Sequence, residues 1–470
     1  MFVAASCDKW LDVKPYDKIS QDELLSTEEG FIKLLNGIYV ELNSDILYGG
    51  ALSVEMIEIM GGAYLMGTDK SVWGNYSDLS QHEYGTEYWR TRMNETWNKA
   101  YSLILNCNLL LENLETTDVQ FTSDNYKIIK GEALALRAML HFDMLRIFGP
   151  VYSRNPQQAA IPYYKKYTVT PNALLSAQEV ASEITHDLLE ARILLVNDPI
   201  RKTGVMMESP ADGSSVFMNY RNLRLNYYAV TGLLARASLY FGEKEAAYSY
   251  STEVIDAASS GIFPFVDKSL VTGSPDDPDR IFSSEILFSL THTQRNKLFK
   301  NYFDPSRIPN YVFRMDNEVM SNLIYGGGAL TGGNQDDYRY RVNWVATGAN
   351  RYFYKYSDMV DVGNIRNTMI PMLRLGEMYL IAAESYSSDI SAGLPYVNLL
   401  RAQRGVGNLQ ELTSELLQYE YIRELFGEGQ LFYMYKRMYS PIIVSAAAIK
   451  NIQPSDAVFV VPLPDSETEN

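Results

Sequence analysis

The sequence predicts a mainly α-helical fold built from paired helices, with long irregular loop insertions between some of them. Apolar residues recur at helical spacing in nine segments of the 470-residue chain, and this spacing is the main sequence signal of an amphipathic helix. Two long stretches between helices are instead rich in Gly, Asp, Ser and Tyr. The predicted architecture is therefore a helical scaffold that carries two large loops.

The nine expected helices cover most of the chain outside these loops. They are 21–42, 89–114, 126–148, 177–195, 222–241, 243–258, 370–386, 391–404 and 412–437. In the third, Leu134, Phe142 and Leu145 lie on an apolar stripe, and Gly149 with Pro150 ends the helix. Taken pairwise, the last eight helices form four helix-turn-helix units, a degenerate version of the repeats that stack into a solenoid. No fixed repeat period is visible, because the insertions separate the pairs.

The two insertions are the stretches 49–88 and 261–356. The first contains GGAYLMGTDKSVWGNYSDLSQHEYG and the second contains GGGALTGGNQDDYRYRVNW. Loops of this length inside a compact protein are usually functional or disordered. Their aromatic content argues against disorder. We therefore expect the ligand site in these two loops.

Composition and charge exclude some classes of partner. The formal net charge is -16 and the sequence pI is about 4.9, so a nucleic-acid backbone or an anionic membrane surface would repel the chain. Neutral ligands such as glycans fit this charge. The chain also contains 35 Tyr, whose rings are able to stack and to hydrogen-bond at once.

The two cysteines lie in very different surroundings. Cys107 belongs to an apolar helix and is interpreted as a buried free thiol. Cys7 follows the run Phe2 to Ser6, which changes from apolar to small residues like the tail of a secretion signal before a lipid-modified cysteine. A single lipid group would tether the protein to a membrane without spanning it. No stretch of about 20 apolar residues is present to cross a bilayer.

Motifs of catalysis are scarce. The chain contains no HExxH, GxSxG, CxxC or GxxxxGK[ST] pattern. Its four histidines are scattered, and His141, inside an apolar helix, is interpreted as structural. A pair of carboxylates for glycoside hydrolysis cannot be recognised without geometry in a chain this rich in Asp and Glu, so a hydrolase remains an alternative.

Three glutamates recur every four residues near the C-terminus. Glu420, Glu424 and Glu428 would align their carboxylates on one helical face. A metal site or an acid/base pair is one interpretation. Ion pairing is favoured, because the nearby cations are Arg423, Lys436 and Arg437.

Sugar binding would need aromatic rings flanked by polar side chains, since a sugar offers an apolar ring face and a rim of hydroxyls. The two insertions contain this mixture. The candidate ligand-binding residues are Asp69, Trp73, Asn75, Tyr76, Tyr325, Arg341, Asn343 and Trp344. The alternative for Trp73 and Trp344 is ordinary packing on the helical scaffold.

Seven short motifs in one order carry a resemblance to a known family. They are Cys7 with Trp10 to Pro15, Trp97 to Asn108, Glu132 to Pro150, Arg374 to Glu384, Asn398 with Arg401, Glu424 to Arg437, and Phe459 to Pro464. With them the chain resembles the SusD/RagB family of cell-surface nutrient-binding lipoproteins. The resemblance extends over nearly the whole chain and implies a TPR-like scaffold of helix pairs whose loops carry the ligand site. It also implies that Asp337 and Arg339 form a structural element.

The resemblance implies a particular organisation of the chain. Residues 1–19 would form a lipid-anchored tether through Cys7, and residues 20–470 would form a single SusD-like domain. Within that domain, 20–260 is the N-terminal helical half, 261–365 is the irregular insertion and 366–470 is the C-terminal helical half.

The resemblance also implies a function and its partners. The protein would bind an oligosaccharide or polysaccharide at the outer membrane and deliver it, without catalysis, to a SusC-like TonB-dependent transporter. Nucleic acid would not be a partner. Peptide uptake of the RagB type is the first alternative, and a surface glycoside hydrolase is the second. No cofactor is expected, whereas a structural cation held by distant loops would leave no spacing signal.

Overall fold

A computed structural model describes residues 21–66, 73–208, 216–273, 277–307, 312–328, 331–361, 363–444 and 449–468. Cys7, the expected lipid anchor, and Asp69, an expected ligand residue, lie outside these ranges. Across the described ranges the chain is mainly helical, as predicted. None of the helices described there is both long and apolar enough to cross a membrane.

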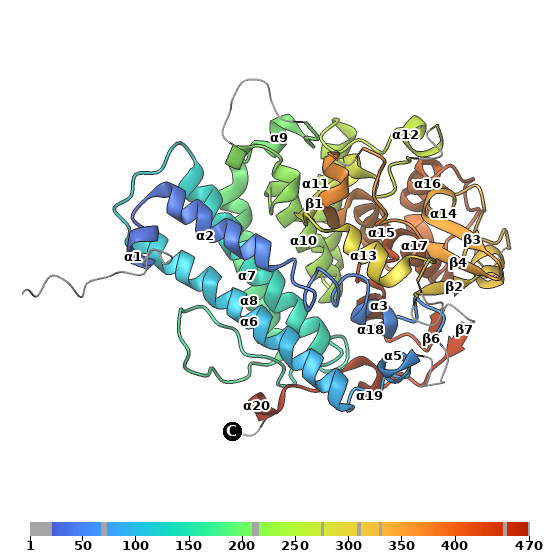
Figure 1. Ribbon diagram of the computed structural model, residues 1–470, viewed down its shortest axis with the longest axis horizontal. Helices are drawn as coiled ribbons and strands as arrows, with labels where there is room; N and C mark the ends of the chain where they lie inside the picture. The colour runs from blue at the N-terminus through green and yellow to red at the C-terminus, as the bar shows by residue number, and fades with distance from the viewer. Residues whose placement is uncertain are drawn as a thin grey trace, which may run out of the picture.

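The long helices form an array in chain order, which confirms the scaffold of packed helix pairs (Figure 1). Its helices are α2 (Glu28–Glu41), α6 (Glu87–Thr116), α7 (Asn125–Phe148), α8 (Ala177–Leu194), α10 (Tyr227–Tyr240), α11 (Lys244–Ser259), α15 (Leu375–Ser385), α16 (Leu394–Gln403), α17 (Ser414–Leu425) and α18 (Leu431–Met438). Helix α2 packs on α6, and from α6 to α15 each helix of the array packs on the next. Helix α15 then packs on both α16 and α17.

Helix α7 lies at the centre of the N-terminal part of the array. Every residue from Gly131 to Phe148 is buried, so this part of the helix has no solvent face and its polar residues need internal partners. Arg137 supplies one such contact, because its guanidinium donates to both carboxylate oxygens of Asp187 on α8 at 2.7 Å. At the end of the helix, Lys436 donates to the backbone carbonyls of Arg146 and Gly149 at 2.8 and 2.7 Å.

Capping residues decide where two of the helices begin. Ser176 and Glu179 form a capping box at the start of α8. Asn226 accepts from the backbone N–H groups of Tyr228 and Ala229, at 2.9 Å each, at the start of α10. The expected start of that helix at residue 222 is therefore wrong, because residues 221–223 form a separate 3₁₀ turn.

Two further expected boundaries differ from the structure. Residues expected to begin the helix 370–386 belong instead to strand β5 (Met369–Arg374), which pairs antiparallel with β1 (Ile286–Thr291). In a short, continuously apolar run, the periodicity cannot distinguish a buried strand from a helix. The expected helix 412–437 is broken between α17 and α18, where Gly427 and Gly429 have positive φ angles of 72° and 67°.

The insertions contain short elements rather than only loops. The first holds α3 (Met56–Met60) and α5 (Asn75–Ser80), and the second holds β1 and an antiparallel sheet in the order β2 (Arg314–Asp316), β4 (Asn350–Phe353), β3 (Trp344–Thr347). This sheet lies on the side of the molecule opposite α2 (Figure 1). Strands β6 (Ile442–Val444) and β7 (Ile449–Asn451) pair near the C-terminus. The last of the seven motifs, Phe459 to Pro464, begins at the end of helix α19 (Asp456–Phe459).

The break between α17 and α18 yields a test of backbone strain. Gly429 has a φ of 67°, and a Cβ there would lie 1.9 Å from the backbone oxygen of Leu52. Gly429→Ala is expected to lower the free energy of unfolding by roughly 1–3 kcal/mol, measured by urea denaturation. Gly407→Ala is the matched control, because nothing lies within 4 Å of the added Cβ. Equal stability of the two variants would contradict this account of the break.

Candidate functional site

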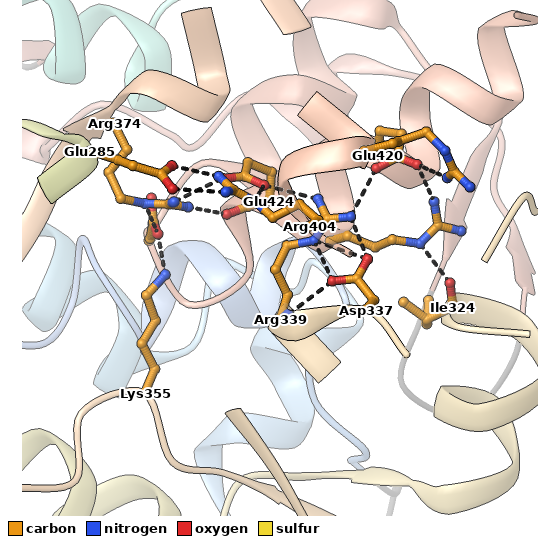
Figure 2. A network of polar contacts seen from close by, with 12 residues as sticks. Glu285, Ile324, Asp337, Arg339, Lys355, Arg374, Arg404, Glu420 and Glu424 are labelled. Carbon is orange, nitrogen blue, oxygen red and sulfur yellow. Dashed lines mark hydrogen bonds and ion pairs between the residues drawn. The ribbon is translucent and has the colours of Figure 1, made fainter. Parts of the chain in front are cut away.

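A network of buried ion pairs joins the second insertion to the C-terminal helices (Figure 2). Its members are all at most 7% exposed, and we call them the Arg–Glu network: Glu285, Asp337, Arg339, Lys355, Arg374, Arg401, Arg404, Glu420, Arg423, Glu424 and Glu428. Four members belong to the second insertion. Three glutamates come from the C-terminal part: Glu420 and Glu424 lie in α17, and Glu428 lies in the break after it. The network therefore fixes the insertion against the scaffold.

Glu424 lies at the centre of the network. Its carboxylate accepts from Arg374 at 2.8 Å, from Arg404 at 2.8 Å and from Arg339 at 2.9 Å. Burial acts to raise the pKa of Glu424, but the three guanidinium charges hold that pKa well below its usual range. The carboxylate is thus ionised, and it accepts hydrogen bonds from all three arginines.

Glu420 and Glu428 complete the row of glutamates. Glu420 accepts from Arg423 at 2.9 Å and Arg339 at 3.1 Å, and it also pairs with Arg401. Although burial acts to raise it, the pKa of Glu420 falls to about 2 under the charges of Arg423, Arg339 and Arg401. Glu428 accepts from Arg374 at 2.7 Å and pairs with Lys355.

Ion pairing, the favoured interpretation of these three glutamates, is confirmed, although only Arg423 of the expected cations is a partner. Lys436 instead contacts the end of α7, and Arg437 pairs with Glu384. The structural interpretation of Asp337 and Arg339 also agrees with the contacts, because Arg339 donates to both carboxylate oxygens of Asp337. No group of three or more His, Cys, Asp or Glu in the described part of the chain has an arrangement that could hold a metal ion.

His141 has a structural environment. One ring nitrogen, Nδ1, lies 2.9 Å from the backbone oxygen of Arg137, and the other, Nε2, lies 3.1 Å from the backbone nitrogen of Tyr164. The first must therefore donate and the second accept, which defines a neutral ring. Burial lowers the pKa of His141 to about 3, so the ring stays neutral near pH 7 and is occupied by the scaffold.

Three of the expected ligand residues are buried next to the network. Trp344 is 5% exposed and lies with its ring centroid 4.8 Å from those of Phe353 and Phe426. Tyr325 is 2% exposed and Asn343 is 5% exposed. A stacking platform must offer one ring face to the ligand, so in this structure Trp344 and Tyr325 act in packing. Their role in binding remains a prediction.

The other expected residues are divided between surface and interior. Asn75 and Arg341 are exposed, and Tyr76 is half-buried. Trp73 is 5% exposed, with the guanidinium carbon of Arg314 at 5.2 Å from its ring centroid. Trp73 and Tyr76 thus lie beside the start of the small sheet, apart from the packing around Trp344.

The two insertions meet each other, although residues 89–260 separate them in sequence. The backbone N–H of Leu65 donates to the oxygen of Arg314 at 2.7 Å. The ring of Phe313 stacks on Tyr64 at 4.5 Å and contacts the edge of Tyr76 at 5.3 Å. The expectation that both loops contribute to one region is consistent with these contacts.

This junction carries three partly exposed tyrosines, which we call the tyrosine cluster: Tyr76, Tyr88 and Tyr302. Tyr302 stacks on Phe313 at 5.4 Å, and Tyr88 packs on Trp89 at 5.0 Å. Tyr88 is 41% exposed. Burial and the charge of Glu55 raise the pKa of all three hydroxyls, which therefore remain protonated.

An ion pair between Glu55 and Arg92 lies beside the cluster. The hydroxyl of Tyr76 donates to Glu55 at 3.1 Å. Tyr88 and Tyr302 were not among the expected ligand residues, since no local pattern links them. The only available signal was the high Tyr content of the two insertions. The result is a junction at which the exposed ring of Tyr88 lies near the partly buried Arg92 and the buried Glu55, and it suits a polyhydroxylated ligand.

Comparisons with known proteins agree with this architecture. The family model described as SusD-like, "Starch-binding associating with outer membrane", matches residues 9–207. A SusD-like protein from Formosa agariphila is 24% identical over 161 residues, and the match spans 30% of that protein's length. Residues 9–207, which the family model matches, include the first helices and the first insertion.

The fold extends the likeness over nearly the full chain. A SusD-like carbohydrate-binding protein from Bacteroides vulgatus shares 20% identity with a TM-score of 0.69, covering 94% of this chain and 96% of the other. A SusD superfamily protein from Bacteroides thetaiotaomicron shares 19% identity with a TM-score of 0.66, covering 94% and 98%. A laminarin-binding SusD-like protein shares 17% identity with a TM-score of 0.60, covering 94% and 98%.

The fold is that of TPR-like helical proteins, and the family model described as SusD-like matches the N-terminal part of the chain. The chain is thus similar to SusD-like proteins in sequence over that part and in fold over nearly its whole length.

Removal of one partner from the Arg–Glu network is expected to destabilise the fold, because it leaves buried charges uncompensated. Glu424→Gln removes the charge that compensates three buried guanidiniums, so it should lower the free energy of unfolding by about 3–5 kcal/mol in urea denaturation. Glu29→Gln is the control, because it removes one carboxylate from an exposed pair with Lys33, and it should leave the unfolding curve unchanged. A small effect of Glu424→Gln would show that the network is dispensable.

Proposed function

We propose that this protein binds a glycan at the cell surface and passes it to a SusC-like TonB-dependent transporter of the outer membrane. The observation that carries the proposal is the SusD-like family match, whose description names starch binding and association with the outer membrane. The laminarin-binding relative by fold supports a glycan as the ligand class. Binding alone, without catalysis, is the proposed activity.

The tyrosine cluster is the proposed contact surface for the glycan. Its rings offer apolar faces at the junction of the two insertions, and Glu55, Arg92 and Asn75 surround them with polar groups. Sugar hydroxyls exchange water for protein partners at a small net gain per hydrogen bond. Affinity at this surface should therefore be modest and should depend on the rings.

Two alternatives give different outcomes in the same assay. A RagB-like peptide receptor would bind peptides rather than glycans. A surface glycoside hydrolase would release products from a bound polymer. The buried, ion-paired state of Glu420, Glu424 and Glu428 disfavours these three as its acid and base.

Calorimetric titration against plant, host and microbial glycans and mixed peptides tests the proposal. We expect binding of at least one glycan class with no products by chromatography. Tyr88→Ala should weaken that binding by about 0.5–1.5 kcal/mol, roughly two- to tenfold in Kd, through the lost ring contact.

Tyr386→Ala is the matched control for this titration. Tyr386 is 51% exposed, similar to Tyr88, but it follows α15 and contacts Tyr248 and Tyr396. Its loss should leave Kd unchanged. Peptide binding alone, or breakdown of the glycan, would refute the proposed function, and equal effects of both substitutions would refute the proposed surface.

We further propose that a lipid on Cys7 anchors the protein. The apolar-to-small run before this cysteine supports the proposal. Intact-mass spectrometry of protein extracted from native membranes should show a lipid adduct on the wild type, and Cys7→Ala should lack it and appear in the soluble fraction. A wild-type mass without an adduct would rule out the anchor.

A further inference from the structure

A cleft of about 270 Å³ lies along α6, away from the tyrosine cluster. Five of its lining residues, Trp97, Asn98, Tyr101, Ser102 and Leu105, come from one face of that helix. The rest are Pro162, Tyr164, Thr168 and Val169 from the segment after α7, and Glu467 from α20 (Asp465–Thr468). Trp97 follows Tyr88 by nine residues, which is about 14 Å along the helix axis. We call this the α6 cleft.

One wall of the α6 cleft is aromatic and held in place. The centroid of the Tyr101 ring lies 4.4 Å from that of Trp97 and 5.6 Å from that of Tyr164. The Tyr101 hydroxyl donates to the backbone oxygen of Pro162 at 3.0 Å, and the Tyr164 hydroxyl accepts from the backbone N–H of Asn172 at 3.1 Å. These bonds fix both rings before any ligand arrives, which reduces the entropy lost on binding.

Polar groups lie beside this aromatic wall. Asn98 and Ser102 are exposed and lie one turn apart on α6. Thr168 adds a hydroxyl, and Glu467 adds a carboxylate that has no ion pair among the described residues. No Lys or Arg lines the cleft, so an anionic ligand would be repelled by the one charge present.

Aromatic rings with amide, hydroxyl and carboxylate groups beside them match a sugar, whose ring face is apolar and whose edge carries hydroxyls. The volume is just below the roughly 300–1,000 Å³ of common small-molecule pockets, which limits the ligand to about one ring. We infer that the α6 cleft is a second carbohydrate site, which takes one neutral pyranose unit and is separate from the tyrosine cluster. This inference rests on the proposed glycan-binding function.

The first experiment titrates neutral monosaccharides (glucose, galactose, mannose) and glucuronate against the full chain by ligand-observed NMR. Ser102→Phe, which fills the cleft, should abolish binding of the neutral sugars. Ser249→Phe, on the exposed side of α11, should leave it unchanged. Glucuronate should bind more weakly than glucose, and Glu467→Gln should reduce that difference. Unchanged binding to Ser102→Phe, or no binding of any neutral sugar, would overturn the inference.

Asn98→Ala provides a second variant should the bulky ring disturb α6. It should weaken monosaccharide binding about two- to tenfold, the effect of one neutral hydrogen bond, and an unchanged Kd would also overturn the inference. The calorimetric glycan titration separates this result from the proposed function. Glycan binding that Tyr88→Ala weakens, in a protein whose α6 cleft takes no sugar, would leave the proposed function intact and remove only the second site.

Discussion

The burial of the Arg–Glu network is the constraint on which the arrangement of the rest of the chain depends. Each charge taken from water costs several kcal/mol unless a partner compensates it. Glu424 is compensated only where Arg339 of the insertion, Arg374 at the end of β5 and Arg404 after α16 converge on it. Since a shift of any one of these segments would leave a buried charge unpaired, α17 and the insertion have one acceptable placement. The network thus supplies specificity more than net stability.

Those parts of the fold that depend on local patterns were predictable from the sequence. The helical stripes of α7 and the Gly149–Pro150 stop are local, and so was the spacing of Glu420, Glu424 and Glu428. The partners of these glutamates were not predictable, because Arg339 and Arg374 approach α17 only through the tertiary fold. For the same reason β5 was mistaken for the start of a helix, since its partner β1 lies about 80 residues earlier.

That the two insertions both carry aromatic and polar groups could be predicted from the sequence, but the exposure of particular rings could not. The two insertions do meet, through Leu65 and Arg314. The exposure of each aromatic ring depends on how its neighbours pack in the folded chain, and the composition of the insertions does not reveal that packing. Trp344 is covered by Phe353 and Phe426, whereas Tyr88, which precedes an expected helix, keeps 41% of its surface exposed.

A continuous series of aromatic contacts connects the network to the proposed glycan surface. Phe426 follows Glu424 at the end of α17, and its ring contacts Tyr64 at 5.8 Å. Tyr64 stacks on Phe313, and Phe313 in turn carries Tyr76 and Tyr302. Because the buried ion pairs fix the first ring of this series, Tyr76 and Tyr302 are oriented before a ligand binds. Pre-orientation of these rings reduces the entropy lost on binding. This matters for a glycan, because each of its hydrogen bonds to the protein contributes little net free energy. A second contact in the α6 cleft would act in the same direction on a long glycan, because a chain bound at one site reaches the other at high effective concentration.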